Sequence, residues 1–114
     1  MISKKKMKLS LFHAIVDKTM SEIEKVLDQN LGYDIHDFEI NNNIMSITFK
    51  SKNKILLTRQ ESIRQLWLAT NRKGYHFKYE NNTWLCIKSC KKINTILKNL
   101  FLKEIPKKKI SKLF

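Results

Sequence analysis

Carboxylates gather in one segment of a chain that is otherwise strongly basic. Residues 17–39 hold seven of the ten acidic residues and two lysines, a net charge of −5, whereas the rest of the 114-residue chain carries +18. Asp17, Glu24 and Asp28 are seven and four residues apart, which places them on one stripe of an α-helix. Because like charges along a helix repel each other, such a stripe fits a surface that meets a cation or a basic protein.

The same segment has the apolar periodicity of a helix over residues 9–30. Ser10 is expected to cap its start, and Gly32 follows its end. His13 lies at the edge of the acidic stripe. The pattern therefore predicts a helix with one face on a core and another face acidic. The apolar face comprises Phe12, Ile15, Val16, Ile23, Val26 and Leu27.

The middle of the chain alternates between apolar and polar residues, as β-strands do, and polar turns interrupt it. Met45, Ile47 and Phe49 are expected to point inward, and consecutive hairpins predict an antiparallel meander. The expected strands cover residues 33–40, 44–49, 54–58, 63–70, 75–79 and 83–87.

A second helix is expected after the strands, with Pro106 ending it. The fold class that follows is α+β, a two-layer sandwich in which the N- and C-terminal helices pack on one face of a five- to six-stranded antiparallel sheet. We expect residues 1–8 to be a basic extension, 9–102 the folded domain and 103–114 a basic tail. The apolar positions of the second helix are Ile93, Ile96, Leu97, Leu100 and Phe101.

Trp67 is a candidate interface residue. On the expected strand, Leu66 and Leu68 suit the helix-covered side, which leaves Trp67 on the open face, where a large aromatic side chain can anchor a partner. Arg59 and Gln60 are the polar neighbours expected around it. Trp67 as a core residue is the alternative, and Trp84 could belong to either face.

Composition narrows the class of protein further. No apolar run is long enough for a membrane helix, and no signal-peptide cleavage site follows the basic start, so a cytoplasmic location without membrane attachment is expected. Cys86 and Cys90 are expected to be free thiols in a reducing compartment. No Ser/His/Asp order, Cys/His pair or glycine-rich phosphate loop is present, so an enzyme is not expected.

Several stretches together resemble the frataxin family, specifically its bacterial members. The resemblance covers about residues 9–102. Its most specific parts are "RQ" at 59–60, "WLAT" at 67–70 and "GYHF" at 74–77. The wider stretches that carry it are "LFHAIVDKTMSEIEKVLD", "FEINNNIMSITF", "RQESIRQLWLAT" and "TWLC".

This resemblance implies an accessory protein of iron–sulfur cluster assembly. Such proteins bind Fe²⁺ or Fe³⁺ weakly and exchangeably, and the bacterial members dock on cysteine desulfurase through an acidic ridge. In the eukaryotic members, the open sheet face around the positions of Gln60 and Trp67 contacts the cluster scaffold protein. A monomer is expected. Iron is hard enough to favour carboxylate oxygens, with imidazole as a further ligand. The acidic ridge implied here comprises Asp17, Glu24, Asp28, His13, Asp34, Asp37 and Glu39.

Two other interpretations stay open. The ridge could be an ordinary solvated helix face, with Lys18 and Lys25 close enough to compete for its carboxylates. Alternatively, the chain could be a small basic nucleic-acid-binding protein, with Tyr75, Phe77 and Tyr79 as a stacking strand on the sheet. Of the 23 basic residues only three are arginine, the side chain on which phosphate and base readers depend. Binding to nucleic acid is therefore expected only as a non-specific side effect.

Overall fold

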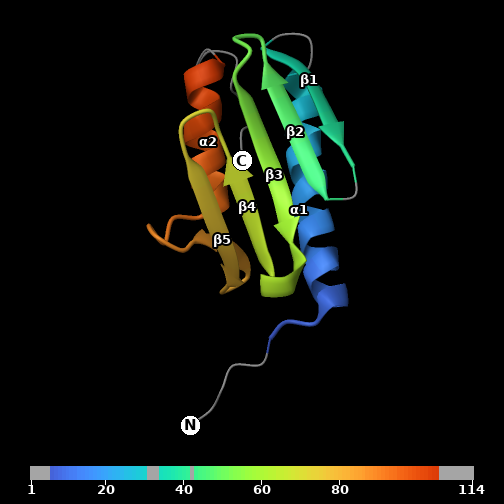
Figure 1. Cartoon of the computed structure of the whole chain (residues 1–114). Coiled ribbons are helices and arrows are strands. Elements are labelled where there is room, and N and C mark those ends of the chain that lie inside the picture. The colour runs from blue at the N-terminus through green and yellow to red at the C-terminus, as the bar shows by residue number, and fades with distance from the viewer. Residues whose placement is uncertain (1–5, 31–33, 42, 106–114) are drawn as a thin grey trace.

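Two helices cover one face of a six-stranded antiparallel sheet (Figure 1). The strands lie side by side in their sequence order, so β1 and β6 form the two edges. This computed structural model describes residues 6–30, 34–41 and 43–105. The predicted α+β two-layer sandwich is confirmed. Its elements are α1 (Leu9–Asn30), β1 (Ile35–Ile40), β2 (Ile44–Phe49), β3 (Lys54–Gln60), the short 3₁₀ helix η1 (Glu61–Ile63), β4 (Gln65–Ala69), β5 (Gly74–Glu80), β6 (Thr83–Cys86) and α2 (Ile93–Glu104).

Helix α1 spans the residues that the periodicity predicts. Its buried side chains recur every three or four residues, and Met20 completes the stripe, which the sequence analysis did not include. Ser10 lies inside the first turn instead of capping it, because the Phe12 N–H already donates to the Lys8 C=O at 2.9 Å. Gly32 lies outside the described residues. The buried stripe is Phe12, Val16, Met20, Ile23 and Leu27.

The β3–β4 connection differs from the strand predicted over residues 63–70. The chain first makes the 3₁₀ turn η1, closed by a hydrogen bond from the Arg64 N–H to the Glu61 C=O at 3.1 Å. Arg64 then takes a left-handed conformation with φ 52°, which an extended strand does not allow. The strand therefore begins at Gln65.

Helix α2 continues past residue 102, where the sequence analysis places the end of the folded domain. Helix α2 continues to Glu104, and Ile105 is buried in the core. The Glu104 carboxylate accepts hydrogen bonds from Asn53 Nδ2 at 3.0 Å and from Ser51 Oγ, which hold the end of α2 on the β2–β3 turn. Pro106 lies outside the described residues. Within the part of the chain that the structure describes, no helix is long and apolar enough to cross a membrane.

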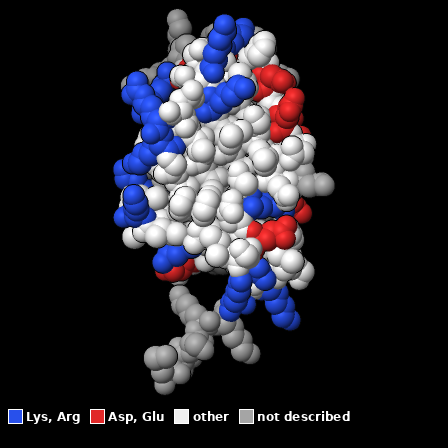
Figure 2. Space-filling view, in the orientation of Figure 1, with Lys and Arg blue, Asp and Glu red and all other residues white. Residues whose placement is uncertain are grey.

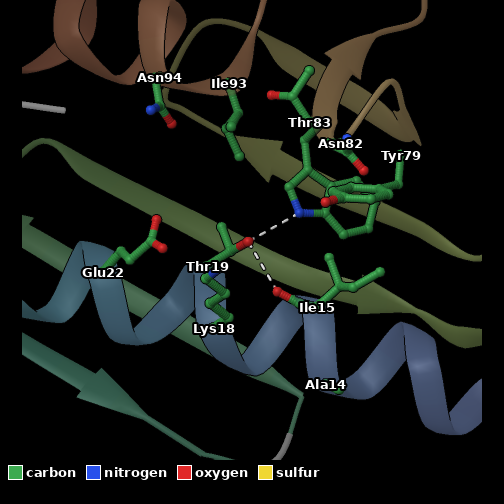
Figure 3. Close-up of a pocket in the computed structure, with 11 residues that line it drawn as sticks. Ala14, Ile15, Lys18, Thr19, Glu22, Tyr79, Asn82, Thr83, Ile93 and Asn94 are labelled. Carbon is green, nitrogen blue, oxygen red and sulfur yellow. Dashed lines mark hydrogen bonds between the residues drawn. The ribbon is translucent and has the colours of Figure 1, made fainter.

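Trp84 belongs to the core. Only 2% of it is exposed, and its ring packs edge-on against Phe12 and Tyr79, with ring centroids 6.1 and 5.1 Å away. Its indole N–H donates to Thr19 Oγ1 at 3.1 Å, and the Thr19 hydroxyl donates to the Ile15 C=O at 3.0 Å (Figure 3). Strand β6 is thereby fastened to α1, beside a cavity of about 390 Å³.

Replacing Thr19 with valine tests this fastening. The substitution keeps the shape of the side chain but leaves the buried indole N–H of Trp84 without its acceptor, which costs about 1–3 kcal/mol. We expect the free energy of unfolding, measured by urea titration with circular dichroism, to fall by that amount. Thr19→Ser keeps the hydroxyl and should lose clearly less; equal losses in both variants would show that the hydrogen bond is unimportant.

Candidate functional site: an acidic ridge and an open sheet face

The buried stripe of α1 fixes the direction of its acidic residues. Because the apolar side chains face the sheet, Asp17 and Asp28 are exposed and Glu24 is half-buried on the outer surface. These three carboxylates form the helical part of the ridge, as their spacing predicts.

Strand β1 supplies the other acidic residues through an irregularity in its pairing. Ile35 is buried, but the register with β2 shifts between Ile35 and Asp37, so that one extra residue is accommodated. After the shift, Asp37 and Glu39 pair with polar residues of β2 and point to the face of the sheet away from the helices, and both are exposed. Asp34 is half-buried, and its Oδ2 is shielded from solvent without a hydrogen-bond partner among the described residues.

Charge is unevenly spread over the open face of the sheet. Acidic side chains gather near the β1 edge, basic side chains line the opposite edge along α2, and a largely uncharged surface separates them (Figure 2). Among the described residues, no salt bridge joins Glu24, Asp28, Asp37 or Glu39 to a lysine or arginine. These four carboxylates therefore keep their charge available to a partner.

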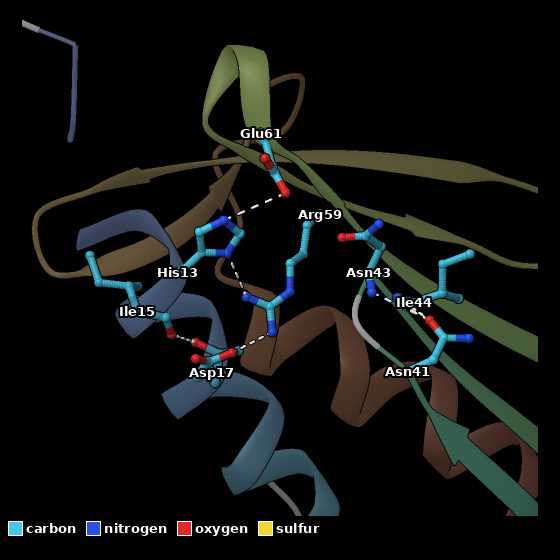
Figure 4. Close-up of polar contacts among 9 residues, drawn as sticks. His13, Ile15, Asp17, Asn41, Asn43, Ile44, Arg59 and Glu61 are labelled. Atoms are coloured by element: carbon cyan, nitrogen blue, oxygen red, sulfur yellow. Dashed lines mark hydrogen bonds and ion pairs between the residues drawn. The ribbon is translucent and has the colours of Figure 1, made fainter. Parts of the chain in front are cut away.

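The N-terminal end of the ridge is neutralised from within. The Arg59 guanidinium donates to Asp17 Oδ1 through Nη2 and lies 2.9 Å from His13 Nδ1 through Nη1 (Figure 4). Because a guanidinium only donates, His13 Nδ1 must accept, and the ring proton is then on Nε2, which faces Glu61 Oε1 at 3.5 Å. Both nitrogens of His13 and one oxygen of Asp17 are thus engaged.

Arg59 does not border Trp67, contrary to the sequence-based expectation. In β3 the buried Ile55 and Leu57 face the helices, and Arg59 continues that alternation. Its side chain is 9% exposed and meets α1 on the side of the sheet opposite to Trp67. Arg59 is therefore a structural partner of the ridge.

Trp67 lies on the open face, half-buried, while Leu66 and Leu68 are buried on the helix side, as predicted. Its ring stacks on His76 of β5 with centroids 3.9 Å apart, and its indole N–H donates to Gln65 Oε1 at 2.8 Å. Gln60 pairs with Gln65 across β3 and β4. We call Gln60, Gln65, Trp67 and His76 the Trp67 patch.

The sequence analysis did not choose His76 or Gln65 as site residues. The signal for His76 was present, because a four-residue turn at 70–73 sets Trp67 opposite His76 once the two strands are paired.

The aromatic strand does not form an exposed stacking surface. Phe77 is fully buried, and Tyr75 and Tyr79 pack against the core on the helix side, while His76 and Lys78 face outward. The alternative of a nucleic-acid-binding face built on Tyr75, Phe77 and Tyr79 loses its aromatic platform.

The ridge is not a ready-made metal cage. Within residues 6–30, 34–41 and 43–105, no group of three or more His, Cys, Asp or Glu side chains lies close enough to hold one metal ion. On this ridge, one or two protein carboxylates would bind a cation, and water molecules would complete its coordination shell.

Comparison with known proteins places this chain in one family. A family model described as a frataxin-like domain matches residues 5–107, and the chain belongs to the frataxin family, with its CyaY-type members. A frataxin from Psychromonas ingrahamii, studied within the CyaY protein family, is 29% identical with a TM-score of 0.78, covering 85% of this chain and 90% of that one.

Two trimeric frataxin structures from the yeast Saccharomyces cerevisiae share the fold. One, complexed with ferrous iron, is 19% identical with a TM-score of 0.68 and covers 92% of each chain. The other, with the full-length N-terminus, is 18% identical with a TM-score of 0.67 and covers 91% of this chain and 84% of that one.

Proposed function

We propose that this protein is a non-enzymatic, iron-binding accessory protein of iron–sulfur cluster assembly that docks on cysteine desulfurase through the acidic ridge. The observation that carries the proposal is the set of carboxylates, Glu24, Asp28, Asp37 and Glu39, that form no salt bridge with any described residue, on a chain whose remainder is strongly basic. Family membership supports it, as does the ferrous complex of the yeast relative.

Iron binding on this surface is expected to be weak and exchangeable. Glu24 and Asp28 are one helical turn apart and can share an Fe²⁺ or Fe³⁺ ion. Asp34, Asp37 and Glu39, on and before β1, offer separate oxygen donors for a further ion. Water must fill most of the coordination shell, so dissociation is easy. His13 and Asp17 would join only by giving up a contact with Arg59 or Glu61.

Docking on a basic surface of the desulfurase uses the same carboxylates without a metal. Complementary charge speeds encounter and fixes orientation. The scaffold protein is proposed to contact Gln60 and Trp67, because a large aromatic ring on the open face suits an interface anchor. We propose a cytoplasmic monomer as the working form.

Purified protein and cysteine desulfurase provide the test. We expect saturable binding by isothermal titration calorimetry that weakens as salt is raised, since exposed charges are screened within about 10 Å at 0.1 M ionic strength. A random DNA duplex at equal concentration should bind more weakly and should not compete. No measurable desulfurase binding, together with tight DNA binding, would contradict the proposal.

Arg59→Met is expected to tighten iron binding rather than weaken it. The substitution frees Asp17 and one nitrogen of His13, which adds two ligand groups at the N-terminal end of the ridge. We expect a several-fold gain in ferrous affinity by anaerobic titration.

Arg64→Met is the matched control for this prediction. Arg64 also carries one charge, but its Nε donates to the Met7 C=O at 2.8 Å, so its removal changes the net charge without freeing a carboxylate. Equal gains in both variants would show that overall charge, and not the release of ligands, controls affinity.

A further inference from the structure

Two cysteines are held near each other in the loop between β6 and α2. Cys86 ends β6, and both of its backbone groups bond within the loop. Its N–H donates to the Lys91 C=O at 2.9 Å, and its C=O accepts the Cys90 N–H at 2.8 Å. An antiparallel bridge between Leu85 and Lys92 closes the loop behind them. The backbone thus fixes where Cys90 lies relative to Cys86.

The backbone spacing of the two cysteines lies within the range that a disulfide bond can span. The hydrogen bond from Cys90 back to Cys86 closes a single α-turn, and four residues of helical rise amount to about 6 Å. Disulfides join residues whose Cα atoms are roughly 4.4–6.8 Å apart. Cys90 also has a left-handed backbone conformation, with φ 60°. A residue other than glycine rarely adopts this conformation unless the surrounding hydrogen bonds hold it there.

The two thiols differ in their surroundings. Cys90 is exposed, whereas Cys86 is buried. Burial raises the pKa of the Cys86 thiol, but hydrogen bonds from the Ser89 hydroxyl and from the backbone at Ser89 and Lys88, with the charge of Lys73, bring that pKa below its ordinary value. The lowered pKa raises the fraction of Cys86 that is thiolate at neutral pH, and the thiolate is the form that attacks sulfur.

We propose that Cys86 and Cys90 are a modification site, a thiol pair that a hydroperoxide oxidises to an intramolecular disulfide. The exposed Cys90 sulfur attacks the peroxide, the O–O bond breaks, and Cys90 becomes a sulfenic acid while an alcohol or water is released. The Cys86 thiolate then attacks the Cys90 sulfur. The S–S bond forms, the S–O bond breaks, and the oxygen leaves as water after taking a proton.

The free thiols that the sequence predicts are the reduced form of this pair. The loop follows β6, at the edge of the sheet opposite to β1 and its acidic residues. Oxidation of the two cysteines can therefore be measured in the absence of iron and of cysteine desulfurase.

Peptide mapping after peroxide treatment tests the proposal. Reduced protein is exposed to hydrogen peroxide at neutral pH, blocked with N-ethylmaleimide in denaturant and digested with trypsin. Because trypsin cuts after Lys88, a Cys86–Cys90 disulfide holds together two peptides that separate on reduction. We expect this linked pair from the monomer fraction of a non-reducing gel.

Two variants make the result specific. Cys90→Ser should abolish the linked pair, and Ser89→Ala, which removes the hydroxyl bonded to the Cys86 sulfur, should form it several-fold more slowly at neutral pH. Thermal unfolding of both variants checks that the fold is intact. Oxidation of Cys90 to sulfinic acid without a linked pair, or a link found only in dimers, would overturn the proposal.

Discussion

Reversing two charges on the ridge, with Glu24→Lys and Asp28→Lys together, is expected to weaken binding to cysteine desulfurase roughly 100-fold, because like charges placed against each other at an interface cost several kcal/mol. Neither carboxylate has a salt-bridge partner among the described residues, so none of these residues offsets the change in charge. Titration calorimetry at fixed salt measures the loss.

The control is a double variant in which two acidic residues outside the ridge are replaced with lysine. Glu22→Lys with Glu80→Lys gives an identical net charge, but Glu22 lines the cavity beside Trp84 and Glu80 ends β5, both away from the ridge. We expect this pair to change affinity only a few-fold. If both double variants lose affinity equally, docking depends on overall charge and the ridge has no special role.

Trp84→Ala carries the largest expected effect on stability. The substitution removes a fully packed side chain, its ring contacts with Phe12 and Tyr79, and its hydrogen bond to Thr19, a loss of about 3–5 kcal/mol. Domains of this kind are stable by about 5–15 kcal/mol in total. Urea titration followed by circular dichroism should therefore show a midpoint far below that of the unchanged protein.

Trp67→Ala is the matched comparison, since it removes the same kind of side chain from the open face. Trp67 is half-buried and stacks on one ring, so we expect a loss of less than about 1.5 kcal/mol. Comparable losses for the two tryptophans would contradict the assignment of Trp84 to the core and Trp67 to the surface.

The long periodic element was the easiest part of the fold to predict. Helix α1 repeats its buried apolar residues over about four turns, so its bounds and its acidic face follow from the sequence. The alternation in 44–49 likewise fixes which residues of β2 face the helices.

Local irregularities were not predictable in the same way. The register shift in β1 turns Asp37 and Glu39 to the open face of the sheet. No residue between Ile35 and Asp37 is of a type that predicts such a shift. The fourth strand begins two residues later than predicted because Arg64 takes a left-handed conformation. That conformation depends on the hydrogen bond from the Arg64 N–H to the Glu61 C=O, which the sequence pattern does not show.

The candidate site was likewise predictable in part. Its carboxylates could be chosen from the sequence, but the partner of Asp17 is 42 residues away, on β3. The predicted strand stopped at residue 58. Extending the inward alternation of Ile55 and Leu57 by two residues would have turned Arg59 toward α1 and revealed the contact.

An anaerobic ferrous titration of isotope-labelled protein, followed by amide NMR, tests the central claim most directly. If iron binds the ridge, paramagnetic broadening will begin at Glu24, Asp28 and residues 34–39, and it will spare the Trp67 patch and the β6–α2 loop. Unchanged ridge amides at millimolar iron, or broadening spread evenly over the surface, would contradict iron binding at this site.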